Sequence, residues 1–461
     1  MTIRVLNRIL ILPSILSAVV LACLAGQPVG DAFAATETEA TPMRTTDPGV
    51  PLADHHQHLL SPAAAELQNH MWAPVALPEG LARLVQERAR AWNDKKVLAA
   101  LYTKEATVFT AESPGWLLGR DRVAAYLSTR FASAYRLTPV KYRIDGSNGH
   151  VIGYFTRGGK HIGYFALAVK QERDGKWLIS AETPAFPGPR LAEPETASQL
   201  VAYLDEAGIR RAVVLSDAYY FDSAKFAGNA AGARDARANV RAENDWTAQQ
   251  VAQFPDRLVA FCSFNPLEDY ALEELDRCKT SRQFAGVKLH FGTSEVDLRN
   301  PAHVRKVRAV VQAANRSRMP IIVHVRAGAN YGRVEAEIML NEIVSAAPDV
   351  PFQIAHLWGG EGYSGAALEV YADAVANGDP RTPNLYFDLA EVALAAGNSQ
   401  ETLQSTVARI RQIGLKRILY GSDGPVADSM SPKDAWKKTQ TLPLTTDELR
   451  SIAGNVAPYL R

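Results

Sequence analysis

The chain has 461 residues, of which 47% are hydrophobic and 21% are charged, and its formal net charge is +1. This composition is typical of a globular protein and excludes a disordered or fibrous one, and the length suits two or three domains. The near-neutral charge, with no basic stripe, gives no indication of nucleic-acid binding.

The first 35 residues have the pattern of a secretory signal. Arg4 and Arg8 precede an almost wholly apolar run at 9–24, and Ala-Phe-Ala at 32–34 offers a small-x-small cleavage site. We therefore expect an exported protein, periplasmic or secreted, with no membrane span after signal removal. A retained membrane anchor is the alternative, but the run is short for a spanning helix.

Three cysteines occur in the chain. Cys23 leaves with the signal, or carries a lipid if the protein is processed as a lipoprotein. Cys262 and Cys278 could pair in an oxidising compartment, but we expect two small buried residues instead. Residues 36–50, rich in Thr, Glu, Ala and Pro, are expected to be a flexible leader.

Residues 78–188 are predicted to form a separate α+β unit. Glu79–Trp92 places Leu81, Leu84 and Val85 along one side, which is the spacing of an amphipathic helix. Turn signals later separate strand-like runs, so we expect an antiparallel meander wrapped on helices. The predicted helices are Glu79–Trp92, Val97–Tyr102 and Val123–Phe131, and the predicted strands are Thr138–Ile144, His150–Arg157, Lys160–Arg173 and Lys176–Glu182.

Three stretches of this unit resemble the SnoaL-like cone fold of the nuclear transport factor superfamily. They are AWNDKKVLAALYTKEATVF (Ala91–Phe109), GRDRVAAYL (Gly119–Leu127) and DGKWLIS (Asp174–Ser180). The resemblance implies a conical pocket, although many members only bind or dimerise. No acid–base pair stands out in the unit, so we assign it no catalysis.

From residue 194 to residue 461, short apolar runs alternate with amphipathic helical patterns. Such runs indicate parallel strands buried on both faces. With Leu52–Leu60, in the segment 51–77, they make eight, which predicts an α/β fold: a (β/α)8 TIM barrel with the α+β domain inserted after strand one. A doubly wound sheet is the alternative, but no glycine-rich phosphate turn follows any strand. The other seven predicted strands are Arg211–Ser216, Leu258–Asn265, Gly286–Phe291, Pro320–Val325, Phe352–Leu357, Asn384–Leu389 and Arg417–Gly421.

Polar residues recur where these predicted strands end, which is the catalytic face of such a barrel. His56 and His58 end strand one, and alternate residues of a strand point to the same face. His324, His356 and Asp423 end strands five, six and eight. Imidazoles that converge with a carboxylate suit one divalent metal, Zn²⁺ first, with Mn²⁺ or Fe²⁺ as alternatives.

Four further residues near these strand ends have more than one interpretation. Lys288 could bind a substrate carboxylate, bridge a second metal after carbamylation, or form an internal salt bridge. Arg326 could clamp an anion or brace its loop. His290 could line the pocket or only pack, and His55 points away from the other two histidines, so we expect it to be structural.

Five short sequence motifs of the barrel together resemble the amidohydrolase superfamily, in the amidohydrolase-related branch that includes carboxymuconate-semialdehyde decarboxylases. They are Asp-x-His-x-His at 54–58, GVKLH, IVHVRAG, IAHLWGG and YGSDGP, in barrel order. The resemblance implies that His56, His58, His324 and Asp423 ligate the metal and that His356 polarises or protonates the substrate. The insertion and the signal depart from the usual pattern of the branch.

The expected function is a metal-dependent hydrolase of a small, carboxylate-bearing amide, ester or lactone. Asp423 and His356 would be catalytic, and Lys288, Arg326 and His290 would bind the substrate. One alternative is a metal-dependent non-oxidative decarboxylase or hydratase that uses the same site. A second is a periplasmic binding protein without catalysis. The expected partner is a small molecule, and a homodimer is possible.

Overall fold

The structure, a computed structural model, describes residues 47–461 apart from 111–112, 114, 130–133, 159, 187–190, 224–234, 327–330, 361, 398 and 425–429. The predicted signal, most of the leader and Phe131 of a predicted helix lie outside the described residues.

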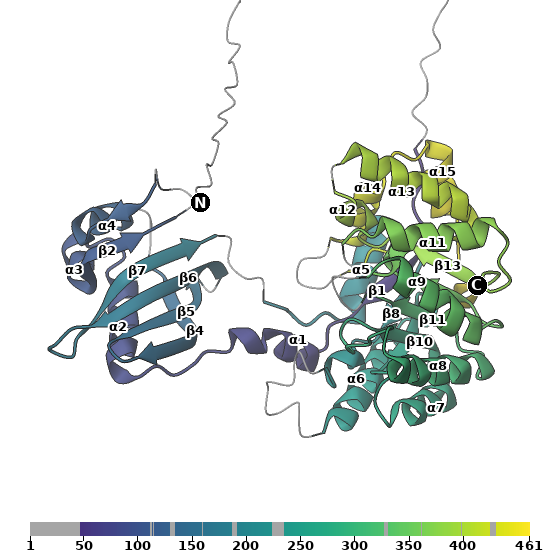
Figure 1. The fold of residues 1–461 in the computed structure, drawn as a ribbon, viewed down its shortest axis with the longest axis horizontal. Coiled ribbons are helices and arrows are strands. Elements are labelled where there is room, and N and C mark those ends of the chain that lie inside the picture. The colour runs from purple at the N-terminus through teal and green to yellow at the C-terminus, as the bar shows by residue number, and fades with distance from the viewer. Residues whose placement is uncertain are drawn as a thin grey trace, which may run out of the picture. The chain divides into compact units, whose positions relative to one another are not determined.

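Eight parallel strands form the larger part of the fold, in the order β1-β8-β9-β10-β11-β12-β13-β14 (Figure 1). The last strand closes onto the first: the His55 amide donates to the Tyr420 carbonyl (2.9 Å) and the Asp423 amide to the His56 carbonyl (2.8 Å). The predicted TIM barrel is therefore confirmed. Its strands are β1 (Ala53–His58), β8 (Arg211–Leu215), β9 (Leu258–Ser263), β10 (Phe284–His290), β11 (Ile321–His324), β12 (Phe352–Ile354), β13 (Leu385–Asp388) and β14 (Ile418–Leu419).

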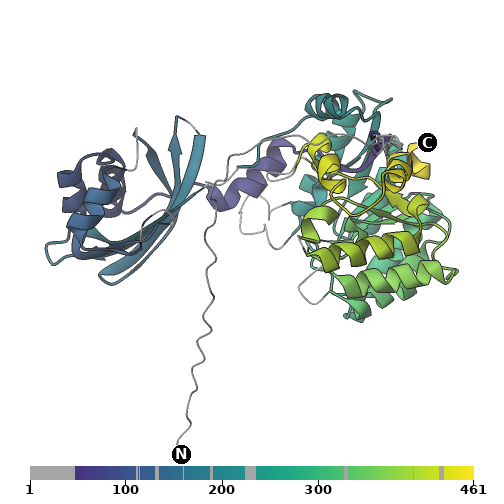
Figure 2. The ribbon, with the colours of Figure 1, turned by 90° about the horizontal axis from the view of Figure 1, so that it is seen from above.

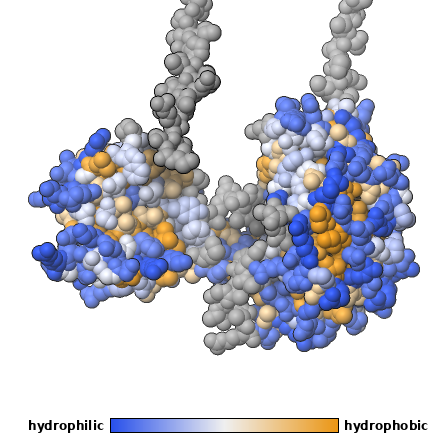
Figure 3. All heavy atoms as spheres, in the orientation of Figure 1, coloured by the Kyte–Doolittle hydropathy of each residue, from blue (hydrophilic) through white to orange (hydrophobic). Residues whose placement is uncertain are grey.

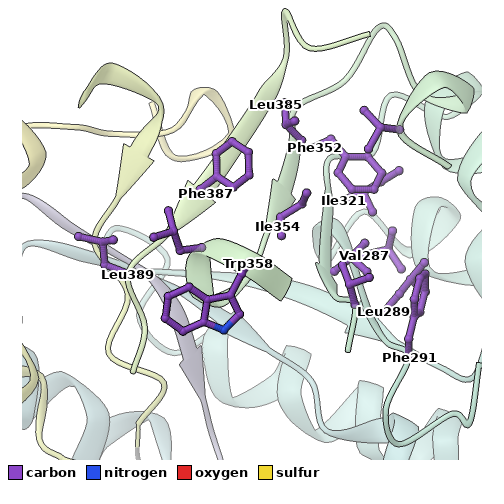
Figure 4. Packing of buried hydrophobic residues seen from close by; sticks show 14 of the residues in the cluster. Val287, Leu289, Phe291, Ile321, Phe352, Ile354, Trp358, Leu385, Phe387 and Leu389 are labelled. Carbon is purple, nitrogen blue, oxygen red and sulfur yellow. The ribbon is translucent and has the colours of Figure 1, made fainter. Parts of the chain in front are cut away.

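The barrel strands are buried on both faces, as their apolar sequences predict. Outward side chains such as Val287, Ile321 and Phe387 pack under the surrounding helices in one large core (Figure 4). Inward side chains form a smaller apolar cluster inside the barrel. Its buried members are Ala53, Val213, Leu215, Phe261, Ile322 and Leu460.

Helices follow most of the barrel strands, and they begin and end with common capping motifs. For example, α5 begins with a capping box between Thr196 and Gln199 and ends at Gly208, which has a left-handed backbone. The longer ones are α5 (Ala197–Ala207), α6 (Ala236–Val251), α7 (Ala271–Ser281), α8 (Pro301–Arg316), α11 (Gly365–Ala376) and α13 (Gln400–Ile413). The shorter ones are α9 (Arg333–Ile338), α10 (His356–Gly359), α12 (Val392–Ala395), α14 (Pro432–Thr439), α15 (Thr446–Ala453), η2 (Ala218–Tyr220), η3 (Met339–Ile343), η4 (Val344–Ala346), η5 (Leu415–Arg417) and η6 (Pro458–Leu460).

The insertion between β1 and β8 is a curved six-stranded sheet, of order β3-β2-β7-β6-β5-β4, with helices against one side (Figure 2). This is the predicted cone fold. It follows α1 (Pro62–Asn69) and η1 (His70–Trp72), and its helices are α2 (Glu79–Arg90), α3 (Lys95–Leu101) and α4 (Arg120–Leu127). Its strands are β2 (Tyr102–Val108), β3 (Leu117–Leu118), β4 (Arg136–Asp145), β5 (Asn148–Arg157), β6 (Lys160–Gln171) and β7 (Trp177–Ala185).

A buried ion pair lies in the core of the insertion. Arg88 of α2 donates through Nη2 to Glu182 Oε1 of β7 at 2.8 Å and through Nε to Glu182 Oε2 at 2.9 Å. The same guanidinium donates to the hydroxyls of Tyr102 and Tyr135. The side chain of Arg88 is 2% exposed, so its charge is neutralised within the core and not by water.

The structure differs from the sequence predictions at two places. The short helix predicted over Val97–Tyr102 is present as α3, but the sequence did not predict the strand that follows it, β2 (Tyr102–Val108), which pairs in parallel with β7. Cys262 of β9 and Cys278 of α7 are not two separate residues, because they form a disulfide whose Cα atoms lie 6.4 Å apart. Both are fully buried, as predicted.

Apolar side chains are visible on the surface of the insertion (Figure 3). Within the described part of the chain, no helix combines the length and the hydropathy that crossing a membrane requires. The large apolar side chains of the insertion that are more than a third exposed are Val97, Phe109, Trp116, Leu118, Tyr142, Ile144, Ile152 and Phe186.

Candidate metal centre

Two strand ends that are far apart in sequence meet at the mouth of the barrel. β1 supplies His56 and His58, and the chain that follows β14 supplies Asp423. The backbone bond from the Asp423 amide to the His56 carbonyl fixes the two segments against each other. His356 joins them as the first residue of α10, two residues after β12 ends, and not from a strand end as predicted.

The Nδ1 atom of each of these histidines faces a partner on the side away from Asp423. His56 Nδ1 lies 3.1 Å from Asp388 Oδ2, and His58 Nδ1 lies 2.7 Å from Asp217 Oδ1. His356 Nδ1 bonds the carbonyl of Ala390 at 3.0 Å. Acceptors at Nδ1 leave the Nε2 lone pairs for another group, which is how proteins orient histidine ligands.

The three Nε2 atoms converge on the carboxylate of Asp423. Its Oδ1 lies 3.2 Å from His56 Nε2 and 3.4 Å from His58 Nε2, and its Oδ2 lies 3.7 Å from His356 Nε2. Ligand atoms around a tetrahedral ion with bonds of about 2.0–2.1 Å lie roughly 3.3 Å apart. The donor set and its spacing therefore fit a divalent cation such as zinc.

The predicted metal ligands differ in how close their ligand atoms lie to one another. Among the described residues, His56, His356 and Asp423 form a group whose ligand atoms all lie within 4.8 Å of one another. His58 lies beside this group, because its Nε2 faces Asp423 Oδ1. His324 instead stacks on His290, with ring centroids 4.0 Å apart. Its ring meets that of His356 edge-on at 5.2 Å. The roles of His324 as ligand and of His356 as catalyst stay predictions.

The two predicted cations have different surroundings. Lys288 is 1% exposed, and its Nζ lies 3.0 Å from His56 Nε2, so it faces the same lone pair as a metal would. Arg326 donates from Nη1 to the carbonyl of Gly362 at 2.7 Å, which braces that loop as one interpretation expected. His290 accepts the amide of Thr293 at Nδ1 and stacks on Tyr219, so packing restrains it from both sides.

Burial keeps most of these histidines neutral. It lowers the pKa of His56 to about 4, helped by the charge of Lys288, and it lowers the pKa of His290 and His324 well below the usual value. His58 is the exception. Burial lowers its pKa, but Asp217 and then Asp423 outweigh burial and raise it to about 9. A cation at His58 Nε2 would therefore have to displace a proton.

Backbone strain is concentrated at this site. His356, Leu357 and Asp423 have φ values of 54°, 61° and 57°, in the left-handed region that side chains other than glycine rarely adopt. Glu391, at φ 55°, lies nearby in the loop after β13. Such strain persists only where the surrounding contacts impose it, and it is often found at functional sites.

A cavity of about 270 Å³ opens beside His356. Glu391 contributes a carboxylate to its wall, and Leu394 and Ala395 make one side apolar. Gly360 and Gly362 line the rest of it. At Gly360, a Cβ atom would lie 2.6 Å from the His324 ring, so only glycine lets the chain pass there.

The sequence predictions missed two carboxylates of this site. Asp388 ends β13, where it accepts His56 Nδ1 and also the amide of His356 at 2.9 Å. Asp217 follows β8 and faces His58. Both follow the rule used for the other residues, a polar side chain at a strand end, and applying that rule to strands two and seven would have found them.

Comparison with known proteins gives a match over more than half of the chain. Residues 179–457 match the profile of the family described as Amidohydrolase. This chain belongs to the amidohydrolase family. The match begins at Ile179, inside the insertion, so it does not include β1 and its histidines. No curated protein is similar enough in sequence to match the chain.

Several solved structures are similar to parts of this amidohydrolase. The 5-carboxyvanillate decarboxylase LigW from Sphingomonas paucimobilis is 18% identical, with a TM-score of 0.39, over 57% of this chain and 82% of that one. The 2,6-dihydroxybenzoate decarboxylase from Rhizobium is 17% identical, with a TM-score of 0.39, over 58% and 87%. A structure named Rd1NTF2_05 is 14% identical, with a TM-score of 0.21, over 23% and 95%.

Proposed function

We propose that this amidohydrolase is a metal-dependent hydrolase of a small amide, ester or lactone. The observation that supports the proposal is the convergence of His56, His58 and His356 on Asp423 through Nε2, with each Nδ1 occupied elsewhere. A divalent cation bound there, zinc first and manganese or iron as alternatives, would lower the pKa of a water from about 16 toward 7.

The chain's own residues supply the proton transfers. Asp423 is 19% exposed at the barrel mouth, so its carboxylate can accept the proton of an attacking water and later return it to the leaving group. His356 lines the cavity, and as an imidazolium, with hydrogens on both nitrogens, it can donate from Nε2 to the substrate carbonyl or protonate the developing anion. Asp388 and Asp217 keep the imidazoles of His56 and His58 aimed at Asp423.

The substrate is proposed to be small and to carry a carboxylate. A cavity of about 270 Å³ limits its size. The buried ammonium of Lys288, 3.0 Å from His56 Nε2, lies where it would attract an anion bound among the ligands. The apolar side of the cavity, Leu394 and Ala395, would contact the rest of the molecule.

A substrate screen tests this proposal. The zinc-loaded protein would be offered 4-nitrophenyl esters, lactones and N-acyl amino acids, beside Asp423→Asn and His356→Asn. We expect hydrolysis of at least one class, and a fall in kcat/KM of about 100-fold or more in each variant. Metal-loaded protein that hydrolyses none of them, or full activity in Asp423→Asn, would contradict the proposal.

Decarboxylation is the second candidate, and Lys288 favours it. An ammonium beside the ligand atoms can orient a substrate carboxylate against the cation. Hydroxybenzoates would be incubated with the loaded protein, and the products would be identified by mass spectrometry together with released carbon dioxide. If carbon dioxide is released and no hydrolysis product is found, the protein is a decarboxylase and the hydrolase proposal is wrong.

A further inference from the structure

A short segment, Val456–Arg461, closes the barrel at the end opposite the metal centre. Leu460 packs in the inner apolar cluster, and its carbonyl accepts a hydrogen bond from Arg211, the first residue of β8. The Tyr459 ring lies edge-on to Phe261, with centroids 5.3 Å apart. The segment therefore reaches into the barrel from the N-terminal ends of its strands.

His55 holds this segment in place. Its Nδ1 bonds the carbonyl of Tyr420 at 2.9 Å, and its Nε2 accepts the amide of Ala457 at 3.1 Å. One strand thus presents His56 to the metal centre and His55, its neighbour, to the closing segment. The two ends of the barrel interior are connected through β1.

A chain of hydrogen bonds, fully buried from Gln353 onward, runs from Tyr459 to the metal centre. The Tyr459 hydroxyl donates to Gln353 Oε1, and Gln353 Nε2 donates to Asp388 Oδ2 at 2.7 Å. Asp388 Oδ2 in turn accepts His56 Nδ1 at 3.1 Å. Gln353 and Asp388 are fully buried, and His56 is 1% exposed, so water does not compete for the two bonds that Asp388 Oδ2 accepts.

Two acceptors, the Asp388 carboxylate and the His55 carbonyl at 3.3 Å, face Nε2 of Gln353, and the Tyr459 hydroxyl anchors the other end of the same amide at Oε1. An amide can rotate and exchange its oxygen with its nitrogen, and the partners on each side fix the orientation. With Nε2 held by these two acceptors, the Tyr459 hydroxyl donates to Oε1 and so fixes the position of the whole amide against Asp388. The reversed amide would place its oxygen against Asp388, where two acceptors repel each other.

We propose that Tyr459 is a positioning residue of the metal centre, which acts through Gln353 and Asp388 on His56. The proposal rests on the proposed metal centre. When the Gln353 amide is held in place, the Asp388 carboxylate stays against the Nδ1–H of His56. This contact makes the Nε2 lone pair of His56 a stronger metal ligand. The same carboxylate accepts the amides of His356 and Ala390 through Oδ1, at 2.9 and 3.1 Å.

Metal affinity tests the proposal without reference to catalysis. Zinc would be titrated against a chelator in the full chain and in Tyr459→Phe, which keeps the ring and removes only the hydroxyl. We expect zinc affinity to fall about 3- to 10-fold, and about 10- to 100-fold in Asp388→Asn, where the direct partner of His56 is changed. Tyr371→Phe is the matched control, because its buried hydroxyl bonds Tyr331 outside the barrel interior.

A double-mutant cycle separates a positioning role from a structural one. In Gln353→Leu the path to Asp388 is cut, so adding Tyr459→Phe should lower zinc affinity no further. A merely structural tyrosine would lower the melting temperature of both Tyr→Phe variants and leave zinc affinity unchanged. Full affinity in Tyr459→Phe, or an equal loss in the presence and absence of Gln353, would overturn the proposal. A wild-type protein that binds no zinc would overturn the metal centre itself.

Discussion

Asp217 favours the protonated form of His58, and this makes metal affinity depend on pH. The pKa of His58 is about 9, because Asp217 and Asp423 outweigh burial, so the imidazole carries a proton at neutral pH. A metal at Nε2 must displace that proton, and affinity should therefore rise about tenfold per pH unit from pH 6 to 8.

Asp217→Asn tests this reasoning. The neutral amide no longer raises the pKa of His58, so the rise of zinc affinity with pH should flatten above pH 7. The measurement is chelator competition across that range, corrected for protonation of the chelator. An unchanged slope in Asp217→Asn would show that another group releases the proton.

Glu243 predicts a pH dependence of stability. Burial, partly offset by the bond from Ser61, raises its pKa to about 8, whereas the unfolded chain has the ordinary value of 4.5. The folded protein holds the proton more tightly, so stability is lost as pH rises from 4.5 to about 8, by up to about 1.4 kcal/mol per pH unit. Glu243→Gln, which stays neutral and can still accept from Ser61, should melt at a temperature that changes less over this range. Parallel melting curves would contradict it.

Sequence patterns indicated which residues meet at the site, but not the backbone conformations and side-chain contacts with which they meet. His56 and His58 do both face Asp423, because strand ends meet at one face of a barrel, although the register of β1 shifts between Asp54 and Gln57. The pattern could not show that His356 sits in α10 with a left-handed backbone, nor that Lys288 faces His56 Nε2. Those features depend on loop geometry and on side-chain rotamers, which leave no periodic signal.

At the scale of elements, the buried pair of Arg88 and Glu182 links α2 to β7 in the insertion. Removing one partner leaves the other charge buried and unpaired, which typically costs about 3–5 kcal/mol. Arg88→Met should therefore destabilise the insertion by that amount while the barrel keeps its metal. Denaturant unfolding and metal content measure the two effects separately.

Arg83→Met is the matched control on the same helix. Arg83 pairs with Glu79 at 2.8 Å, but both side chains are more than half exposed, and such pairs are worth about 0–1 kcal/mol. If Arg88→Met unfolds with the same midpoint as Arg83→Met, the buried pair does not hold the insertion together.

Element types followed from sequence more reliably than pairings did. The barrel strands were predicted because each is a short apolar run between helical patterns. β2 was missed because Tyr102–Val108 carries exposed Lys104 and Glu105 and directly follows a helix. The bond between Cys262 and Cys278 could not be predicted either, because it joins two elements whose packing the sequence does not specify.

At the scale of the whole molecule, the disulfide bears on where the protein folds. Disulfides persist in oxidising compartments, so we propose that this bond forms after the export that the first 35 residues predict. Protein purified from the periplasm should be lighter than its reduced form by two hydrogen atoms, and peptide mapping should join Cys262 to Cys278. Free thiols at both positions in periplasmic protein would contradict the pairing.

In the proposed metal centre, His56, His58 and Asp423 hold one divalent cation. The measurement that tests it most directly is metal content by mass spectrometry on the purified mature protein, beside a His56→Ala, His58→Ala double variant and a His150→Ala control in the insertion. We predict about one zinc, manganese or iron per chain in the wild type and the control, and almost none in the double variant. Folded wild-type protein without metal, or a double variant that keeps it, would contradict the account.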